Sequence, residues 1–170
     1  MTASELAEFN RLATPQAEQL LLAFCGSPKW AAELAALRPF AELEGLAVSA
    51  AEVWQAQPLA QKMAAFAAHP RIGERNAGTD TDTQRQVKEQ SHVMASESQV
   101  LDEFDELNVA YFDRFGFTFI VCAAERQADE MLALLRACLQ HSRDEEVARA
   151  SIEQEKITLL RISKHFAADE

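Results

Sequence analysis

The sequence predicts an all-α fold, a single-domain bundle of about eight or nine helices over residues 1–170. The first observation behind this prediction is that the 170 residues contain only five glycines and five prolines. The second is that 31 residues are alanine, which has the highest intrinsic helix propensity. The third is that helix-capping residues recur along the chain, two of them followed by proline. Helix formers that are interrupted by such start signals favour many short helices.

Two helices are predicted where a capping residue precedes proline. A Thr-Pro pair at 14–15 predicts a helix over 14–25, and a Ser-Pro pair at 27–28 predicts one over 28–37. A glycine follows the first helix and a proline follows the second, and both residues disfavour its continuation.

Two more helices are predicted before residue 70. Ser49 and Glu52 have the spacing of a capping box, which predicts that a short helix begins at Ser49. Pro58 predicts the start of the next helix, which ends at His69 because a proline comes directly after it.

A long loop and a long helix are predicted in the middle of the chain. Residues 71–82 contain two glycines and alternating threonine and aspartate, which are typical of loops. Helix resumes near residue 83, and after a polar break near Ser96 an amphipathic helix continues to Gly116.

The apolar run 117–124 is compatible with a short strand or with the start of a buried helix. Two further helices are predicted over 128–140 and 145–166. Ser142 and Glu145 have the capping-box spacing that would begin the second of them.

The charge and the cysteines exclude several classes of function. A net charge of −11 repels a phosphate backbone and an anionic membrane surface, so we expect no nucleic-acid partner and no membrane binding. The longest apolar run is too short to span a bilayer. Three cysteines cannot all pair within the chain, and no secretory signal opens the sequence. We therefore expect a reduced, cytoplasmic protein.

Two groups of polar residues are candidates for chemistry. His69 lies between a helix end and the 71–82 loop, a corner position that suits acid-base work, although interaction with the helix C-terminus is the common alternative. Gln86, Glu89 and Gln90 share one helix face by their spacing, which is also the pattern of a solvated polar face.

Two further candidates lie towards the C-terminus. Arg161 either extends into solvent or points into a cleft towards an anionic ligand. The 115–121 segment is typical of a core, but its backbone N–H groups could serve a ligand if it is not helical. The four histidines show no metal-ligand spacing, and the cysteines lie in apolar or helical contexts, so we expect neither a metal site nor a cysteine nucleophile.

Several motifs, taken in order, resemble the family of OHCU (2-oxo-4-hydroxy-4-carboxy-5-ureidoimidazoline) decarboxylases, which act between urate and allantoin. The matching motifs are Cys-Gly-Ser-Pro-Lys-Trp at 25–30, Arg-Pro-Phe at 38–40, His-Pro-Arg-Ile-Gly at 69–73, Glu-Gln at 89–90, a stretch from Leu-Asn at 107–108 through Tyr111 to Phe-Gly-Phe-Thr-Phe-Ile-Val-Cys-Ala at 115–123, and Lys-Ile and Leu-Arg within 156–161. The chain departs from the family pattern at Gln86, where a serine is usual, and at 124–126, where Gly-Arg is more familiar.

The resemblance implies an all-α homodimer that binds a small-molecule ureide and uses no metal or organic cofactor. It implies that His69 is the catalytic histidine and Glu89 its partner. The substrate-binding residues that it implies are Pro70, Gln86, Gln90, Phe119, Ile120, Val121, Cys122, Ala123 and Arg161.

The implied reaction is decarboxylation of OHCU to (S)-allantoin in purine catabolism. His69 would remove a proton from the substrate hydroxyl or ureido group, or deliver one to the carbanion-like carbon, and Glu89 would orient His69 or bind the ureido N–H groups. Arg161 and backbone N–H groups would stabilise the developing negative charge. Two alternatives stay open from the residues alone: a helical binding or scaffold module, and a related enzyme that acts on a different ureide.

Overall fold

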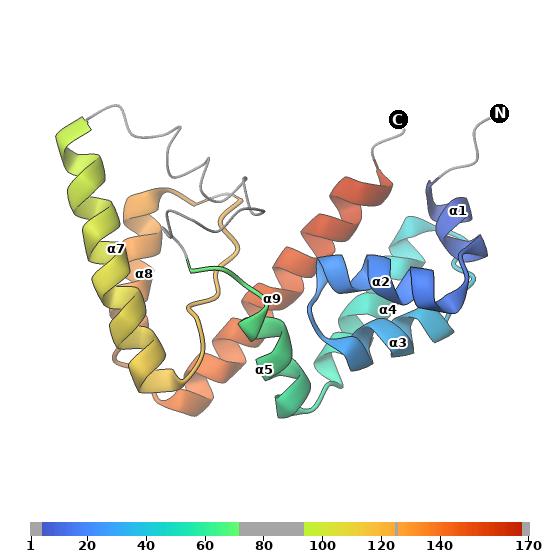
Figure 1. Ribbon diagram of the computed structural model, residues 1–170, viewed down its shortest axis with the longest axis horizontal. Coiled ribbons are helices and arrows are strands. Elements are labelled where there is room, and N and C mark those ends of the chain that lie inside the picture. Colours follow the sequence, from blue (N-terminus) through green and yellow to red (C-terminus); the bar gives the residue numbers. More distant parts are fainter. Residues whose placement is uncertain (1–4, 72–93, 125, 168–170) are drawn as a thin grey trace. The chain divides into compact units, whose positions relative to one another are not determined.

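The computed structural model describes residues 5–71, 94–124 and 126–167 (Figure 1). These residues form eight helices and contain no strand, which confirms the predicted all-α fold class. The helices are α1 (Glu5–Arg11), α2 (Thr14–Phe24), α3 (Pro28–Ala36), α4 (Leu43–Gln55), α5 (Leu59–Ala67), α7 (Met94–Phe115), α8 (Ala128–Cys138) and α9 (Arg143–Phe166). Among the described helices, none combines the length and the apolar character that crossing a bilayer requires.

The chain divides into two compact units. Unit 1 comprises Met1–Ala68 and Gln154–Glu170, and unit 2 comprises His69–Glu153. Helix α9 contributes its first part to unit 2 and its last part to unit 1. The prediction of one domain over 1–170 stays a prediction.

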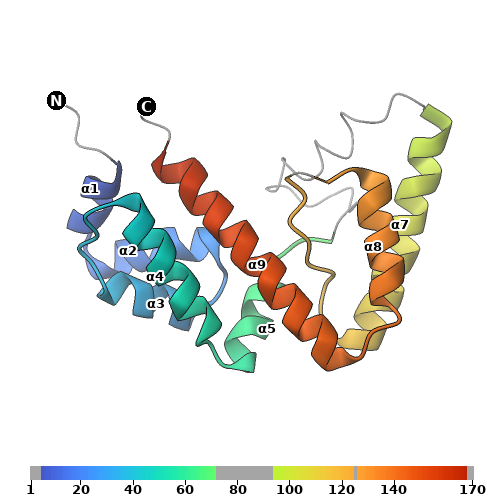
Figure 2. The same cartoon turned by 180° about the vertical axis from the view of Figure 1, so that it is seen from behind.

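Unit 1 is built around two buried tryptophans. Trp30 on α3 and Trp54 on α4 are almost fully buried, and the Trp54 ring packs edge-on against Phe66 of α5. The Trp30 indole N–H donates a hydrogen bond of 2.9 Å to the Ala50 carbonyl oxygen, so burial leaves it paired. Helices α2, α3 and α4 lie together around this core in both views (Figures 1 and 2).

Two predicted helix starts are confirmed by their hydrogen bonds. The Ser27 hydroxyl accepts the Trp30 backbone N–H at 3.3 Å and caps α3. At the start of α9, the Ser142 hydroxyl accepts the Glu145 N–H, and the Glu145 carboxylate accepts the Ser142 N–H at 2.7 Å. This reciprocal pair is the predicted capping box.

Two other predicted starts are wrong. Ser49 does not begin a helix, because α4 already begins at Leu43, and the buried residues Leu46, Ala50 and Trp54 form one continuous stripe through it. Thr14 is the first residue of α2 rather than its cap. The break predicted near Ser96 is also wrong, since α7 runs through it.

The cap of α2 is Ala13, whose backbone N–H donates to the Gln16 side-chain oxygen at 3.3 Å. Helix α1 was not predicted from the sequence. A residue far along the sequence holds the C-terminal end of α1 in place. Arg38 Nη1 donates hydrogen bonds of 2.8 and 2.9 Å to the Phe9 and Leu12 carbonyl oxygens.

Unit 2 contains α7 and α8, which lie side by side and run in the same direction (Figures 1 and 2). Helix α7 ends at Phe115, and the next residue, Gly116, has a φ of 79°, which suits glycine after a helix C-terminus. The chain then returns along the helix pair as an extended segment before α8 begins. The 117–123 run is therefore neither the strand nor the helix start that its apolar pattern allowed.

Candidate active site

The predicted catalytic histidine lies just after α5. Helix α5 ends at Ala67, and His69 and Pro70 follow after Ala68, both half-buried. The guanidinium of Arg71 lies over the Phe112 ring of α7, 5.3 Å from its centroid. The corner predicted from the His-Pro pair is present, and a cation–π contact within unit 2 joins the following residue, Arg71, to α7.

The other predicted site residues are distributed over the chain. Residues 119–123 belong to unit 2, as His69 and Pro70 do, whereas Arg161 belongs to unit 1. Gln86, Glu89 and Gln90 lie outside the described residues, as does the loop predicted over 71–82 beyond Arg71.

Aromatic side chains hold the start of the extended segment. The Tyr111 ring of α7 contacts the rings of Phe115, Phe117 and Phe119, with centroids 4.6, 5.7 and 5.4 Å away. These alternate residues all turn towards Tyr111, and all are buried. The apolar side chains are therefore committed to the core, and what the segment can offer a ligand is largely its backbone.

A buried carboxylate organises the polar side of the same region. Glu146 on α9 is fully buried, and it accepts a hydrogen bond of 2.6 Å from the Tyr111 hydroxyl. Arg149 Nε lies 2.9 and 3.1 Å from its two oxygens, and His141 Nδ1 lies 2.7 Å from one of them. Burial raises the pKa of Glu146, but these hydrogen bonds and the Arg149 charge together hold it below its ordinary value.

Two side chains of α9 bind the backbone of the segment. Arg149 Nη1 donates to the Ile120 carbonyl oxygen at 2.8 Å, and its guanidinium lies over the Phe119 ring. The Glu153 carboxylate accepts the Cys122 N–H at 2.7 Å and also contacts Arg126 at 3.3 Å. The Cys122 N–H is thereby committed to Glu153, which narrows the set of backbone donors predicted for substrate.

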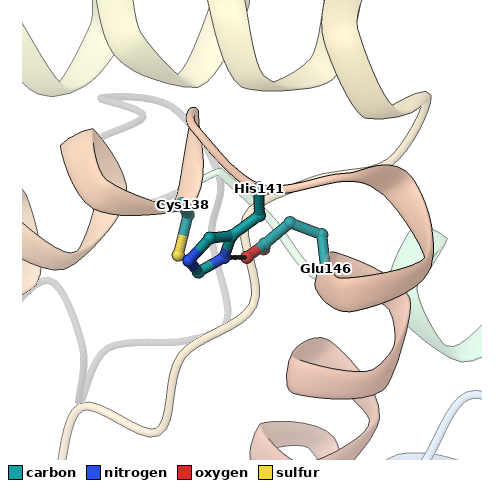
Figure 3. A group of neighbouring side chains, drawn as sticks. All are labelled: Cys138, His141 and Glu146. Atoms are coloured by element: carbon teal, nitrogen blue, oxygen red, sulfur yellow. Dashed lines mark hydrogen bonds and ion pairs between the residues drawn. The ribbon is translucent and has the colours of Figure 1, made fainter.

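A cluster of potential metal ligands lies beside this network (Figure 3). The ligand atoms of Cys138, His141 and Glu146 all lie within 4.8 Å of one another. Two features oppose a cation here. Burial raises the pKa of the Cys138 thiol to about 12, which disfavours the thiolate that a metal ion would need. The Glu146 carboxylate is already paired with the positive guanidinium of Arg149. The cluster is better suited to fixing the end of α8 against α9.

Sequence reasoning missed this cluster because its members come from the end of α8, the following turn and α9. Cys138 and His141 lie at and beyond the end of α8, and Glu146 lies in the first turns of α9. A signal was available for Glu146 alone, because the charged residues at 146, 149 and 153 recur at helical spacing on the face of α9 that also carries the apolar Ala150.

Arg161 does not extend freely into solvent. It is half-buried, and its Nη1 donates to the Phe24 carbonyl oxygen at the end of α2, at 3.2 Å. The neighbouring Cys25 thiol has a pKa raised to about 11, chiefly by burial, with the Arg161 charge acting in the opposite direction. All three cysteines are free in the structure.

Comparison with known proteins identifies the family. The family model described as OHCU decarboxylase matches residues 10–163. An Arabidopsis thaliana protein named uric acid degradation bifunctional protein TTL is 36% identical over 84% of this chain, and this chain covers 45% of its length. A Haloferax volcanii protein named 2-oxo-4-hydroxy-4-carboxy-5-ureidoimidazoline decarboxylase is 28% identical over 82% of this chain and 83% of its own.

A solved structure matches as well. It is described as an OHCU decarboxylase in the presence of (S)-allantoin, is 30% identical, and aligns over 87% of this chain and 97% of its own with a TM-score of 0.75. The chain spans less than half of the Arabidopsis protein, so the likeness there concerns one part of a longer molecule. Since the family model covers nearly the whole sequence and the fold agrees, the chain belongs to the OHCU decarboxylase family.

Proposed function

We propose that this protein decarboxylates OHCU to (S)-allantoin in urate degradation, without a metal or organic cofactor. The observation that carries the proposal is the alignment with the OHCU decarboxylase structure, which extends over 87% of this chain and 97% of the other. The uric acid degradation named for the Arabidopsis relative supports the same pathway.

The chemistry requires an electron sink and a proton donor. Loss of CO₂ breaks the bond between the carboxylate and the carbon that bears the hydroxyl group, and the electron pair delocalises into the imidazolinone ring. The hydroxyl proton then leaves as that carbon becomes a carbonyl, and one proton must reach the adjacent carbon, which bears the ureido group, on a single face to give one enantiomer. An imidazole is suited to this step, because its unperturbed pKa of about 6.5 allows it to accept and donate a proton near neutrality.

In this proposal His69 moves the proton and Glu89 orients it. Arg161 and the backbone of residues 119–123 hold the carbonyl and carboxylate oxygens and stabilise the negative charge that develops. Pro70, Gln86 and Gln90 complete the substrate-binding set, with the Gln86 amide in place of the serine that is usual in the family. The half-buried corner position of His69 supports its role, because it restricts the ring.

We further propose that the protein is a cytoplasmic homodimer. Three free cysteines, two of them buried, fit a reducing compartment. Light scattering coupled to gel filtration tests the dimer, for which the expected mass is about twice the 18.9 kDa of one chain.

The activity is tested by generating OHCU in situ from urate with urate oxidase and hydroxyisourate hydrolase. We expect faster decay of OHCU and a persistent circular dichroism signal of (S)-allantoin. His69→Ala should lower the rate about a hundredfold or more, in line with the loss of a general acid-base group. His165→Asn is the matched control, because it removes an imidazole that contacts Phe24 and Phe166 in unit 1.

Racemic allantoin formed at the spontaneous rate by the folded wild-type protein would contradict the proposed function and favour a binding module. Acceleration that survives in His69→Ala would instead contradict only the role of the histidine.

A further inference from the structure

Three charged side chains of α9 face the extended segment from one side. Glu146, Arg149 and Glu153 are spaced by three and four residues, which places them on one face of the helix. Glu146 is fully buried, the Glu153 side chain is 6% exposed, and the Arg149 side chain is 17% exposed. Charged groups so far from solvent require a compensating set of contacts.

The contacts of Arg149 and Glu153 fall on two consecutive peptide groups. Arg149 holds the carbonyl oxygen of the peptide that joins Ile120 to Val121, and Glu153 holds the N–H of the peptide that joins Val121 to Cys122. In a planar trans peptide the carbonyl and the N–H point in opposite directions. Arg149 therefore directs the Val121 N–H away from itself, and Glu153 directs the Val121 carbonyl away from itself.

The arrangement fixes a donor and an acceptor on one residue. Packing of the buried Val121 side chain fixes that side chain more than it fixes the backbone. By itself, this packing would leave the two peptide planes on either side of Val121 free to rotate. Two charge-assisted hydrogen bonds, each to a different plane, remove that freedom. A neighbouring donor and acceptor are the complement of an amide or ureido group, which carries an N–H and a carbonyl side by side.

Glu146 orients the guanidinium of Arg149. Its two oxygens bind Arg149 Nε, which leaves Nη1 aimed at Ile120. A buried ion pair contributes little net stability, because desolvation offsets the attraction between the charges. The role of this ion pair is geometric. It holds the planar guanidinium of Arg149 in one orientation, so that the guanidinium fixes the backbone of the segment relative to α9.

We propose that Arg149 and Glu153 are positioning residues, which hold the backbone of Phe119–Ala123 in the conformation that binds substrate. The inference rests on the proposed function for its substrate. The positioning of the backbone can be measured without substrate. A failure of the positioning role can therefore be distinguished from a failure of the proposed function.

The first measurement is amide hydrogen exchange at Cys122 in the free protein. Glu153→Leu removes the acceptor, and we expect exchange at Cys122 to accelerate about tenfold or more, as loss of a hydrogen bond to a charged group predicts. Glu153→Gln keeps an acceptor oxygen and should restore most of the protection. Glu155→Leu is the matched control, because this glutamate on the same helix contacts Gln55 instead.

The second measurement is steady-state kinetics with OHCU. Arg149→Met and Glu153→Leu should raise KM about tenfold or more and lower kcat less, and Arg149→Lys should be intermediate because it keeps the charge but not the fork. Arg136→Met, which removes an exposed arginine paired with Glu103, should leave both constants unchanged. If Arg149→Met does not fold, Glu146→Gln combined with Arg149→Met removes the unpaired charge and carries the same expectation.

Wild-type exchange at Cys122 in folded Glu153→Leu would overturn the proposal, as would a wild-type KM in folded variants of both residues. Accelerated exchange in a protein whose wild type does not decarboxylate OHCU would overturn the proposed function and, with it, the substrate assigned to the segment.

Discussion

Gly26 lies against Ala68 so closely that a methyl group on Gly26 would come within 2.4 Å of the Ala68 Cβ. Gly26 connects α2 to α3, and Ala68 is the residue immediately before His69. The two residues are therefore in close contact at the C-terminal cap of α5, one residue before the catalytic candidate His69.

Gly26→Ala is expected to displace the end of α5. Because the Ala68 methyl is attached directly to the backbone, it cannot yield as a flexible side chain would, and we expect a loss of about 1–3 kcal/mol in the free energy of unfolding. Activity should fall further than stability explains, since the shift passes along the chain to His69. Urea unfolding and the OHCU assay check the two parts.

Gly45→Ala is the matched control. Gly45 lies inside α4 with open space around it, so alanine there should stabilise the protein by about 0.5–1 kcal/mol. Equal effects of the two substitutions would contradict the interpretation of Gly26.

Glu146 should make stability depend on pH in the acid range. Its pKa is lower in the folded protein than the ordinary value of 4.5, so the folded state binds its proton less readily than the unfolded state. The contribution to stability is therefore fully present above pH of about 4.5 and is lost as the pH falls through the folded pKa. Urea unfolding between pH 6 and 3 should show this decline.

Glu146→Gln should flatten the decline, because glutamine does not titrate. Glu42→Gln is a suitable comparison, since Glu42 is an exposed glutamate before α4. An unchanged pH profile in Glu146→Gln would argue against the lowered pKa.

Cys122 should be the reactive thiol among the three cysteines. Cys25 and Cys138 are buried, with pKa values raised to about 11 and about 12 by burial, whereas Cys122 is half-buried. At pH 8 a thiol-specific disulfide reagent should modify one cysteine per folded chain and all three in denaturant. Cys122→Ser should abolish the rapid reaction, and a rapid second equivalent would contradict the burial of the other two.

Zinc should not stabilise the protein through Cys138, His141 and Glu146. The Arg149 charge on Glu146 and the raised pKa of the Cys138 thiol both oppose cation binding. We expect the Tm to be unchanged by stoichiometric Zn²⁺ or by a chelator. A rise in Tm that is lost in His141→Ala would establish a metal centre instead.

Helix starts set by neighbouring residues could be predicted from the sequence, and those set by packing could not. Ser27 and Ser142 cap their helices through partners three residues away, so the local motif contains the whole interaction. Ser49 carries the same motif, but the stripe that includes Leu46 and Trp54 continues through it, and burial of that stripe outweighs a cap.

The candidate site divides in the same way. The His69-Pro70 corner follows from local chemistry, and the structure has it. The conformation of the 117–123 run depends on Arg149 and Glu153, which lie about 30 residues further along the chain, and a local pattern does not contain that information.

This separation in sequence also sets the order in which the segment and the side chains that hold it are synthesised. The ribosome releases the extended segment and α8 before the residues of α9 that hold Ile120 and Cys122 in place. A nascent chain that ends at α8 therefore lacks both Arg149 and Glu153, the side chains that hold the segment, however well its earlier helices have folded. If the segment binds substrate, catalysis begins only once translation has passed Glu153, and a ribosome stalled upstream yields an inert fragment.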